Sequence, residues 1–107
     1  MQLSNYMIII AKSTLKAFIR TSPDSENALD NWYEISKQND WKNFNEMKKS
    51  FNSVDSVGND RYVFNIKGNH YRLIALILFK VRTVFILFIG THKEYDLIDA
   101  STITFEN

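Results

Sequence analysis

Two almost purely apolar segments near the C-terminus limit the folds open to this chain more than any other feature. They span residues 71–79 and 84–90 and are separated by only four residues. A strand that is apolar at consecutive positions is buried on both faces, and neither segment is long enough to cross a membrane as a helix. The sequence therefore predicts two neighbouring antiparallel strands in the middle of a sheet.

The residues before these segments continue the sheet. Residues 60–67 alternate between apolar and polar side chains, which is the period of a half-buried strand. Gly68 and Asn69 follow, and both residue types tolerate the positive φ of a tight turn. With a further short strand at residues 54–58, this region predicts an antiparallel meander.

The N-terminal half has the apolar spacing of helices. A short strand is predicted at residues 7–10, and three helices follow it. We expect the first helix to be capped by Ser13, the second to run from Pro23 to about Lys37, and the third to cover about residues 43–50.

Length and composition agree with one packed domain of the α+β class. At 107 residues, 45% of them apolar, the chain can form one core but not two. We expect a single domain over residues 1–107, with the first strand and the helices packed on the meander, a short C-terminal helix or tail, and residues 1–6 as an extension. There is no cysteine and no signal-peptide pattern, which predicts a cytoplasmic protein without disulfides or membrane association.

Basic residues are concentrated in the strand-rich part of the chain. Between residues 61 and 93 there are six lysines and arginines and no acidic residue, although the whole chain has a net charge of only +1. These six are Arg61, Lys67, Arg72, Lys80, Arg82 and Lys93. The distribution predicts a surface that binds an anion. The alternative is that they are only solvated residues of a small sheet.

The predicted turn determines which residues face one another across the first hairpin. The facing pairs are Lys67 with His70, Asn65 with Arg72, and Arg61 with Leu76. The polar members, Arg61, Asn65, Lys67, His70 and Arg72, are therefore predicted to share one side of the sheet.

The second hairpin extends this set to the end of the last strand. If the loop between the two apolar segments is tight, Arg72 lies opposite Thr91, and a one-residue slip places it beside His92 or Gly90. We therefore expect Arg72 and His92 to be neighbours at one end of the sheet.

Several kinds of catalytic site are not expected. The chain has two histidines and no cysteine, and it lacks both a Gly-x-Ser-x-Gly motif and a glycine-rich phosphate loop, so no metal centre and no cofactor are predicted. Acid–base chemistry on a bound phosphate remains. RNA suits such a site because its own 2′-hydroxyl is the nucleophile, and the protein needs only a base, cations and an acid.

The residues at the predicted site have this chemistry. His92 can act as base or acid, Arg72 can hold a phosphate in a bidentate contact, and Tyr95 can stack on a base or donate its hydroxyl proton. The candidates for RNA binding are Arg61, Asn65, Lys67, His70 and Lys93. Two structural alternatives stay open: His92 as a cap or surface residue, and Arg72 in an ion pair with Asp60, Glu94 or Asp96.

Five ordered blocks resemble the HigB-type toxins of bacterial toxin–antitoxin modules. They are residues 30–33, 41–44, 61–66, 68–73 and 91–96, so the resemblance extends over about residues 7–99. These toxins belong to the RelE-like group of small α+β endoribonucleases. The resemblance implies metal-independent cleavage of messenger RNA, typically on the translating ribosome. It also implies a hetero-oligomer with a cognate antitoxin that has a helix-turn-helix DNA-binding domain.

The chain departs from the family pattern in its last strand. Relatives usually have Ile-Arg where this chain has Ile86-Leu87, so a cation is missing. The phosphate-binding role then falls to Arg72 and Lys93. The alternative is a catalytically weak or inactive module that binds RNA or its antitoxin.

Overall fold

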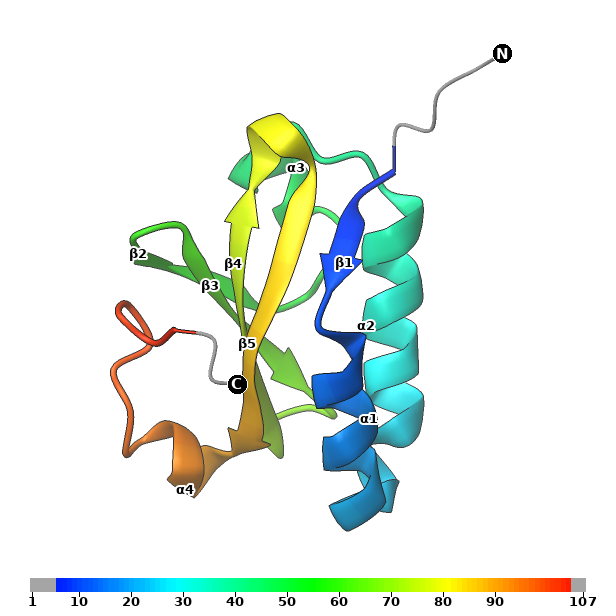
Figure 1. The fold of residues 1–107 in the computed structure, drawn as a ribbon, viewed down its shortest axis with the longest axis vertical. Helices are drawn as coiled ribbons and strands as arrows, with labels where there is room; N and C mark the ends of the chain where they lie inside the picture. The colour runs from blue at the N-terminus through cyan, green and yellow to red at the C-terminus, as the bar shows by residue number, and fades with distance from the viewer. Residues whose placement is uncertain (1–5, 105–107) are drawn as a thin grey trace.

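In the part of the chain that the structure describes, five strands form one sheet in the order β1-β5-β4-β3-β2 (Figure 1). The structure is a computed structural model and describes residues 6–104. The strands are β1 (Ile8–Ile10), β2 (Val54–Gly58), β3 (Arg61–Ile66), β4 (Tyr71–Leu78) and β5 (Thr83–Thr91). The predicted meander is confirmed, since β2 to β5 are antiparallel neighbours, and β1 adds to β5 in parallel. Apart from Tyr6, the predicted extension at residues 1–6 lies outside the described residues.

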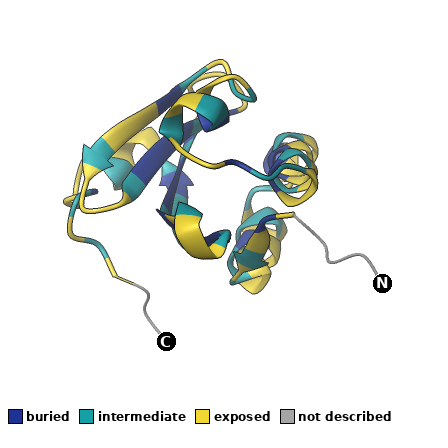
Figure 2. Cartoon of the chain, turned by 90° about the horizontal axis from the view of Figure 1, so that it is seen from above, coloured by how far each residue is buried: buried dark blue, intermediate teal, exposed yellow. Residues whose placement is uncertain are grey.

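In residues 6–104 four α-helices accompany the sheet, so the α+β class is confirmed. They are α1 (Lys12–Thr21), α2 (Glu26–Gln38), α3 (Phe44–Lys48) and α4 (His92–Tyr95). Seen end-on in Figure 2, the two long helices stand together beside the sheet. In Figure 1, α4 follows the lower end of β5, and the chain continues from it across the opposite side of the sheet.

Two of the predicted helix starts are wrong. Helix α1 begins at Lys12 after Ala11, whose φ of 75° is left-handed, and Ser13 lies inside the first turn. Residues 23–25 form a separate 3₁₀ turn in which the Ser25 hydroxyl donates to the Ser22 carbonyl at 2.7 Å, so α2 begins only at Glu26. The tight connection between α1 and α2 therefore uses the proline for a 3₁₀ turn.

The main core lies between the helices and one face of the sheet. The alternating residues of β3 and β4 point into it, and Phe64 and Leu73 are almost completely buried there. From the helices come Leu29, Trp32 and Met47, all at most 2% exposed. This packing leaves the other residues of β3 and β4 on the second face of the sheet.

The second face is covered in part by α4 and the segment that follows it. Val63 and Ile74 form a small second cluster with Ala100, and Phe88 and Tyr95 pack against it. The same face carries Asn65 and Arg72, because side chains alternate along a strand. The candidate site therefore belongs to the face opposite the long helices.

The predicted register of the first hairpin is confirmed for two pairs: Asn65 lies opposite Arg72, and Arg61 lies opposite Leu76. Between β4 and β5 the register slips by one residue, so Arg72 lies opposite Gly90. The hairpin pairs Leu78 with Thr83, which by itself would place Arg72 opposite Ile89, and a β-bulge at Leu87, which has no partner on β4, moves the pairing by one residue to Gly90.

Removing a buried side chain from the helix layer tests this core. Leu29 is fully buried, so Leu29→Ala leaves a cavity and should lower the free energy of unfolding by about 2–5 kcal/mol. Urea denaturation followed by circular dichroism measures this loss. The control is Leu97→Ala, because Leu97 is 85% exposed and its truncation should change stability by no more than about 0.5 kcal/mol. Equal effects of the two substitutions would contradict the described packing.

Candidate functional site

Arg72 is the central cation of the candidate site. It sits on β4 between Asn65 of β3 and Gly90 of β5 and is half-buried. Its guanidinium donates only to two main-chain carbonyls, of Asn69 at 3.4 Å and of Tyr71 at 3.3 Å. Within residues 6–104 it forms no ion pair, so the pairing with Asp60, Glu94 or Asp96 is not observed. Arg72 therefore keeps donors for an external anion.

Helix α4 begins at His92, two residues after Gly90, which lies opposite Arg72 in the sheet. A capping box at Thr91 sets this start. The Thr91 hydroxyl accepts from the Glu94 N–H at 3.2 Å, and the Glu94 carboxylate accepts from the Thr91 N–H at 2.8 Å. His92 and Lys93 thereby become the first helical residues, and both are exposed. The Thr-x-x-Glu signal was visible in the sequence but was not used to place this helix.

Gly90 allows α4 to approach the sheet closely. A Cβ at this position would lie 2.6 Å from the Phe88 ring and 3.1 Å from a Glu94 carboxylate oxygen. Any larger residue here would therefore require the Phe88 ring and the Glu94 carboxylate to move.

Asp96 is a member of the site that the sequence reasoning missed. Its Oδ2 lies 3.6 Å from Nδ1 of His92, one helical turn earlier. The two side chains are 62% and 53% exposed. The i,i+4 spacing of His92 and Asp96 was the signal that could have found this pair.

Tyr95 is held differently from its neighbours. Its ring is half-buried against the second cluster, which contains Val63 and Ile74. The contact anchors α4 to the sheet. In this position Tyr95 stabilises the helix that carries His92.

Arg61 does not lie beside Arg72 at the candidate site. It begins β3, and its guanidinium donates to the Ile103 carbonyl through Nε at 3.2 Å and Nη2 at 2.8 Å, and to the Asn59 carbonyl at 2.9 Å. In this structure Arg61 fastens the C-terminal segment to the sheet.

Lys67 does not lie on the side of the sheet that carries Asn65 and Arg72, so the prediction is wrong for this residue. The left-handed residues of the turn are Lys67 and Gly68, with φ of 53° and 63°, and a left-handed residue breaks the alternation of a strand. The Lys67 ammonium pairs with the Asp24 carboxylate at 2.7 Å, and the same carboxylate accepts a hydrogen bond from the Tyr71 hydroxyl at 2.6 Å. The hydrogen bond from Lys67, followed by that from Tyr71, lowers the pKa of Asp24.

The remaining predicted residues stay close to Arg72 in the fold. Asn65 donates from its amide to the Ser53 hydroxyl at 2.7 Å. His70 is exposed in the turn, and its Nδ1 lies 2.8 Å from the Lys67 carbonyl oxygen, so this nitrogen acts as the donor. The structure thus groups Asn65, His70 and Arg72 with the start of α4, and it separates Arg61 and Lys67 from them.

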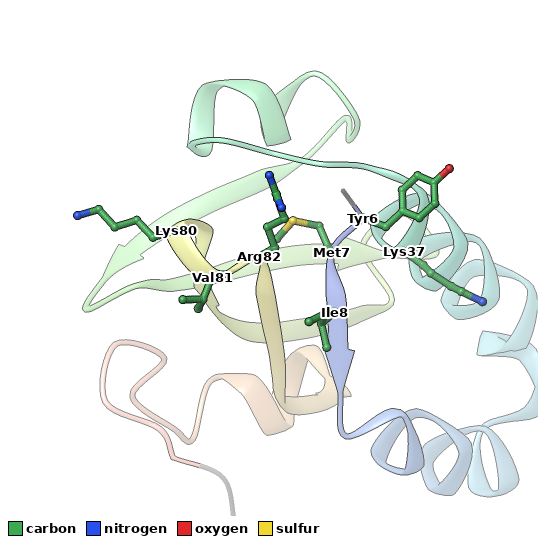
Figure 3. Close-up of a pocket in the computed structure, with 7 residues that line it drawn as sticks. All are labelled: Tyr6, Met7, Ile8, Lys37, Lys80, Val81 and Arg82. Carbon is green, nitrogen blue, oxygen red and sulfur yellow. The ribbon is translucent and has the colours of Figure 1, made fainter. Parts of the chain in front are cut away.

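A cavity of about 420 Å³ lies at the other end of β5, far from this group (Figure 3). Apolar residues line part of it, and Lys37, Lys80 and Arg82 surround them. Arg82 is paired with Asp40 at 2.6 Å. None of the predicted site residues lines this cavity.

Two features of the described residues bear on other kinds of site. Residues 6–104 contain no group of three or more histidine, cysteine, aspartate or glutamate side chains arranged to hold a metal ion. None of the helices in this part of the chain is long and apolar enough to cross a membrane.

Comparison with known proteins decides the family. Residues 25–98 match the HigB_toxin family model, described as the RelE-like toxic component of a toxin–antitoxin system. The chain belongs to the HigB toxin family. It is 34% identical over 92 residues to the mRNA interferase HigB of Escherichia coli O6:H1, covering 84% of this chain and 89% of the relative. It is 29% identical over 96 residues to the mRNA interferase toxin HigB of Escherichia coli K12, covering 88% and 92%. The resemblance of the five HigB blocks is thereby confirmed.

The capping box can be tested directly at Glu94. Glu94→Ala removes the acceptor for the Thr91 N–H and should lower stability by about 1 kcal/mol or less. Hydrogen exchange of the Thr91 amide should become faster in this variant. Glu94→Gln is the control, because glutamine also completes a capping box and should retain the protection. Unchanged exchange in Glu94→Ala would contradict the described start of α4.

The contacts of Asp24 predict a pH dependence of stability. Its pKa lies below the ordinary value of 3.8 in the folded protein, so its interactions stabilise the fold above about pH 4 and are lost as the pH falls through the lowered pKa. Between about pH 6 and pH 3, the wild type should lose more free energy of unfolding than Asp24→Asn. Asp30→Asn, which changes an exposed acid of α2, should follow the wild type. Identical profiles of the wild type and Asp24→Asn would exclude this contribution.

Proposed function

We propose that this chain is an endoribonuclease that cleaves messenger RNA, as the toxin of a toxin–antitoxin pair. The observation that carries the proposal is Arg72, a half-buried arginine without an ion pair in the described part of the chain, next to the exposed start of α4. Burying a cation costs free energy, which a bound phosphate offsets. The relatives named mRNA interferases support RNA as the source of that phosphate.

The chemistry follows from the groups at this end of the sheet. His92 removes the proton of a ribose 2′-hydroxyl, the 2′-oxygen attacks the adjacent phosphorus, and the bond to the 5′-oxygen breaks. The products are a 2′,3′-cyclic phosphate and a 5′-hydroxyl, whose proton comes from a general acid. Arg72 and Lys93 stabilise the additional negative charge on the phosphate. Asp96, whose Oδ2 lies 3.6 Å from Nδ1 of His92, stabilises the imidazolium that forms when His92 takes up the proton, and Tyr95 holds α4 in place. The reaction needs no metal, because the substrate supplies its own nucleophile.

The exposure of the site favours an RNA substrate that another molecule, such as the ribosome, holds in position. The His92 side chain is 53% exposed. An exposed acid–base group accelerates the reaction most when the phosphate is already fixed in position beside it. Messenger RNA on the ribosome is such a substrate, and the resemblance to HigB toxins supports it. We further propose that this chain is cytoplasmic and that it forms a hetero-oligomer with a helix-turn-helix antitoxin.

Substitution at Arg72 and His92 tests the proposal. His92→Ala should lower the rate of messenger RNA cleavage on programmed ribosomes by about 10²–10⁴-fold, because it removes the acid–base group. Arg72→Ala should lower it too, and Arg72→Lys should recover only part of the rate, since lysine cannot form the bidentate contact. The control is Arg20→Ala, an exposed cation at the end of α1. Full activity of the His92 and Arg72 variants would overturn the enzymatic proposal.

A non-catalytic module of the same fold is the second candidate. Leu87 in place of the family's arginine favours it, as do the occupied guanidinium of Arg61 and the ion pair of Lys67. Such a module would bind RNA with a steep salt dependence and leave it intact on programmed ribosomes.

A further inference from the structure

Asp24 connects the helix layer to the turn between β3 and β4, which comprises residues 67–70 and leads into Arg72. Its Oδ2 accepts from the Lys67 ammonium at 2.7 Å, and its Oδ1 accepts from the Tyr71 hydroxyl at 2.6 Å. Lys67 begins the turn and Tyr71 begins β4. One carboxylate therefore binds both ends of the turn, across 43 and 47 residues of sequence.

Two members of this network have little freedom to move. Asp24 lies in the short 3₁₀ turn before α2, where Pro23 restricts the backbone and Ser25 is fully buried. Tyr71 is 8% exposed, and its ring packs edge-on against Phe18 with the ring centroids 5.2 Å apart. The Asp24 carboxylate and the Tyr71 hydroxyl therefore meet from two well-anchored segments.

The turn itself has a conformation that needs support. Lys67 and Gly68 are both left-handed, with φ of 53° and 63°. Glycine adopts this conformation freely, but a residue with a side chain seldom does. Two contacts support Lys67 there: its ammonium pairs with Asp24, and its carbonyl accepts from the His70 N–H at 3.2 Å. Removing the Asp24 carboxylate therefore leaves the turn with less to hold it in this form.

The same turn supplies the acceptors of the Arg72 guanidinium. Nη1 of Arg72 donates to the Asn69 carbonyl at 3.4 Å and to the Tyr71 carbonyl at 3.3 Å. Both distances are long for hydrogen bonds, so a small shift of the turn would break them. Backbone pairing places Arg72 on β4, whereas the direction of its guanidinium depends on these two carbonyls.

We propose that Asp24 is a positioning residue of the candidate site, because it holds the turn that aims the guanidinium of Arg72. It acts through its contacts with Lys67 and Tyr71. A bidentate contact between a guanidinium and a phosphate requires a fixed orientation of the two groups. The inference rests on the proposed function, in which Arg72 contacts the cleaved phosphate. Lys67 thus contributes to the site through Asp24, although its ammonium does not lie beside Arg72.

An NMR measurement on the free protein at pH 7 tests the positioning without any need for activity. In the wild type the heteronuclear NOE of Arg72 Nε should exceed that of Arg20, an exposed arginine of α1. In Asp24→Ala it should fall toward the Arg20 value, because the guanidinium gains fast motion. The matched control is Asp30→Ala, which removes an exposed acid of α2 and should leave the Arg72 signal unchanged. Equal Arg72 values in all three proteins would overturn the proposal.

Cleavage kinetics on programmed ribosomes give a second readout. Asp24→Ala should lower kcat by about tenfold and change KM by less than about twofold, because Arg72 acts on charge that develops in the transition state. In an Arg72→Ala background the same substitution should have no further effect, since Asp24 acts through Arg72. Tyr71→Phe removes only the hydroxyl and retains the ring, so it should lower kcat in the same direction by a smaller factor.

The outcomes separate this inference from the proposed function. No cleavage by the wild type would reject the proposed function, and the NMR comparison would then decide by itself whether Asp24 aims Arg72. Equal losses from Asp24→Ala with and without Arg72 would indicate a purely structural role and overturn the positioning proposal, while the enzyme remained. Wild-type kcat in both Asp24→Ala and Tyr71→Phe would overturn it as well.

Discussion

The register of β4 between its two neighbours is the constraint on which the rest of the site depends. Backbone pairing places Arg72 between Asn65 and Gly90, and no side-chain contact of the arginine is needed for that position. A slip of one residue would turn Arg72 toward the helix layer and expose the core residues of the strand, so burial of the core maintains the register. The bulge at Leu87 then decides which residues of the second half of β5 face Arg72.

The six residues from Thr91, the last residue of β5, to Asp96 include some with structural contacts and some with chemical groups that stay exposed. Thr91 and Glu94 form the capping box, and Tyr95 packs on the second cluster. His92 and Lys93 remain exposed because these contacts hold the helix from both sides. A short helix of four residues has little stability of its own, so its cap and its packing contact supply what propensity cannot.

The basic residues of the sheet also serve different purposes. Arg61 binds the carbonyl of Ile103, and Lys67 pairs with Asp24. Arg82 pairs with Asp40 at the opposite end of β5. These contacts neutralise or occupy cations that the charge distribution alone had assigned to one anion-binding surface. Among the described residues, this leaves Arg72 and Lys93 as the basic residues of the candidate site that form no ion pair.

Local patterns in the sequence determined the meander, the helix layer and the pairing of Asn65 with Arg72, because strand alternation and turn residues act over a few positions. The family was also readable from ordered blocks of residues. The tertiary structure alone decided where Lys67 and Arg61 point, since their partners lie 43 and 42 residues away along the chain. It also decided the gap at the edge of β3, where β2 begins only opposite Phe64 and residues of α2 and of the segment 50–53 line a cavity of about 360 Å³. Contacts between distant segments depend on the packed fold as a whole, and no local pattern encodes them.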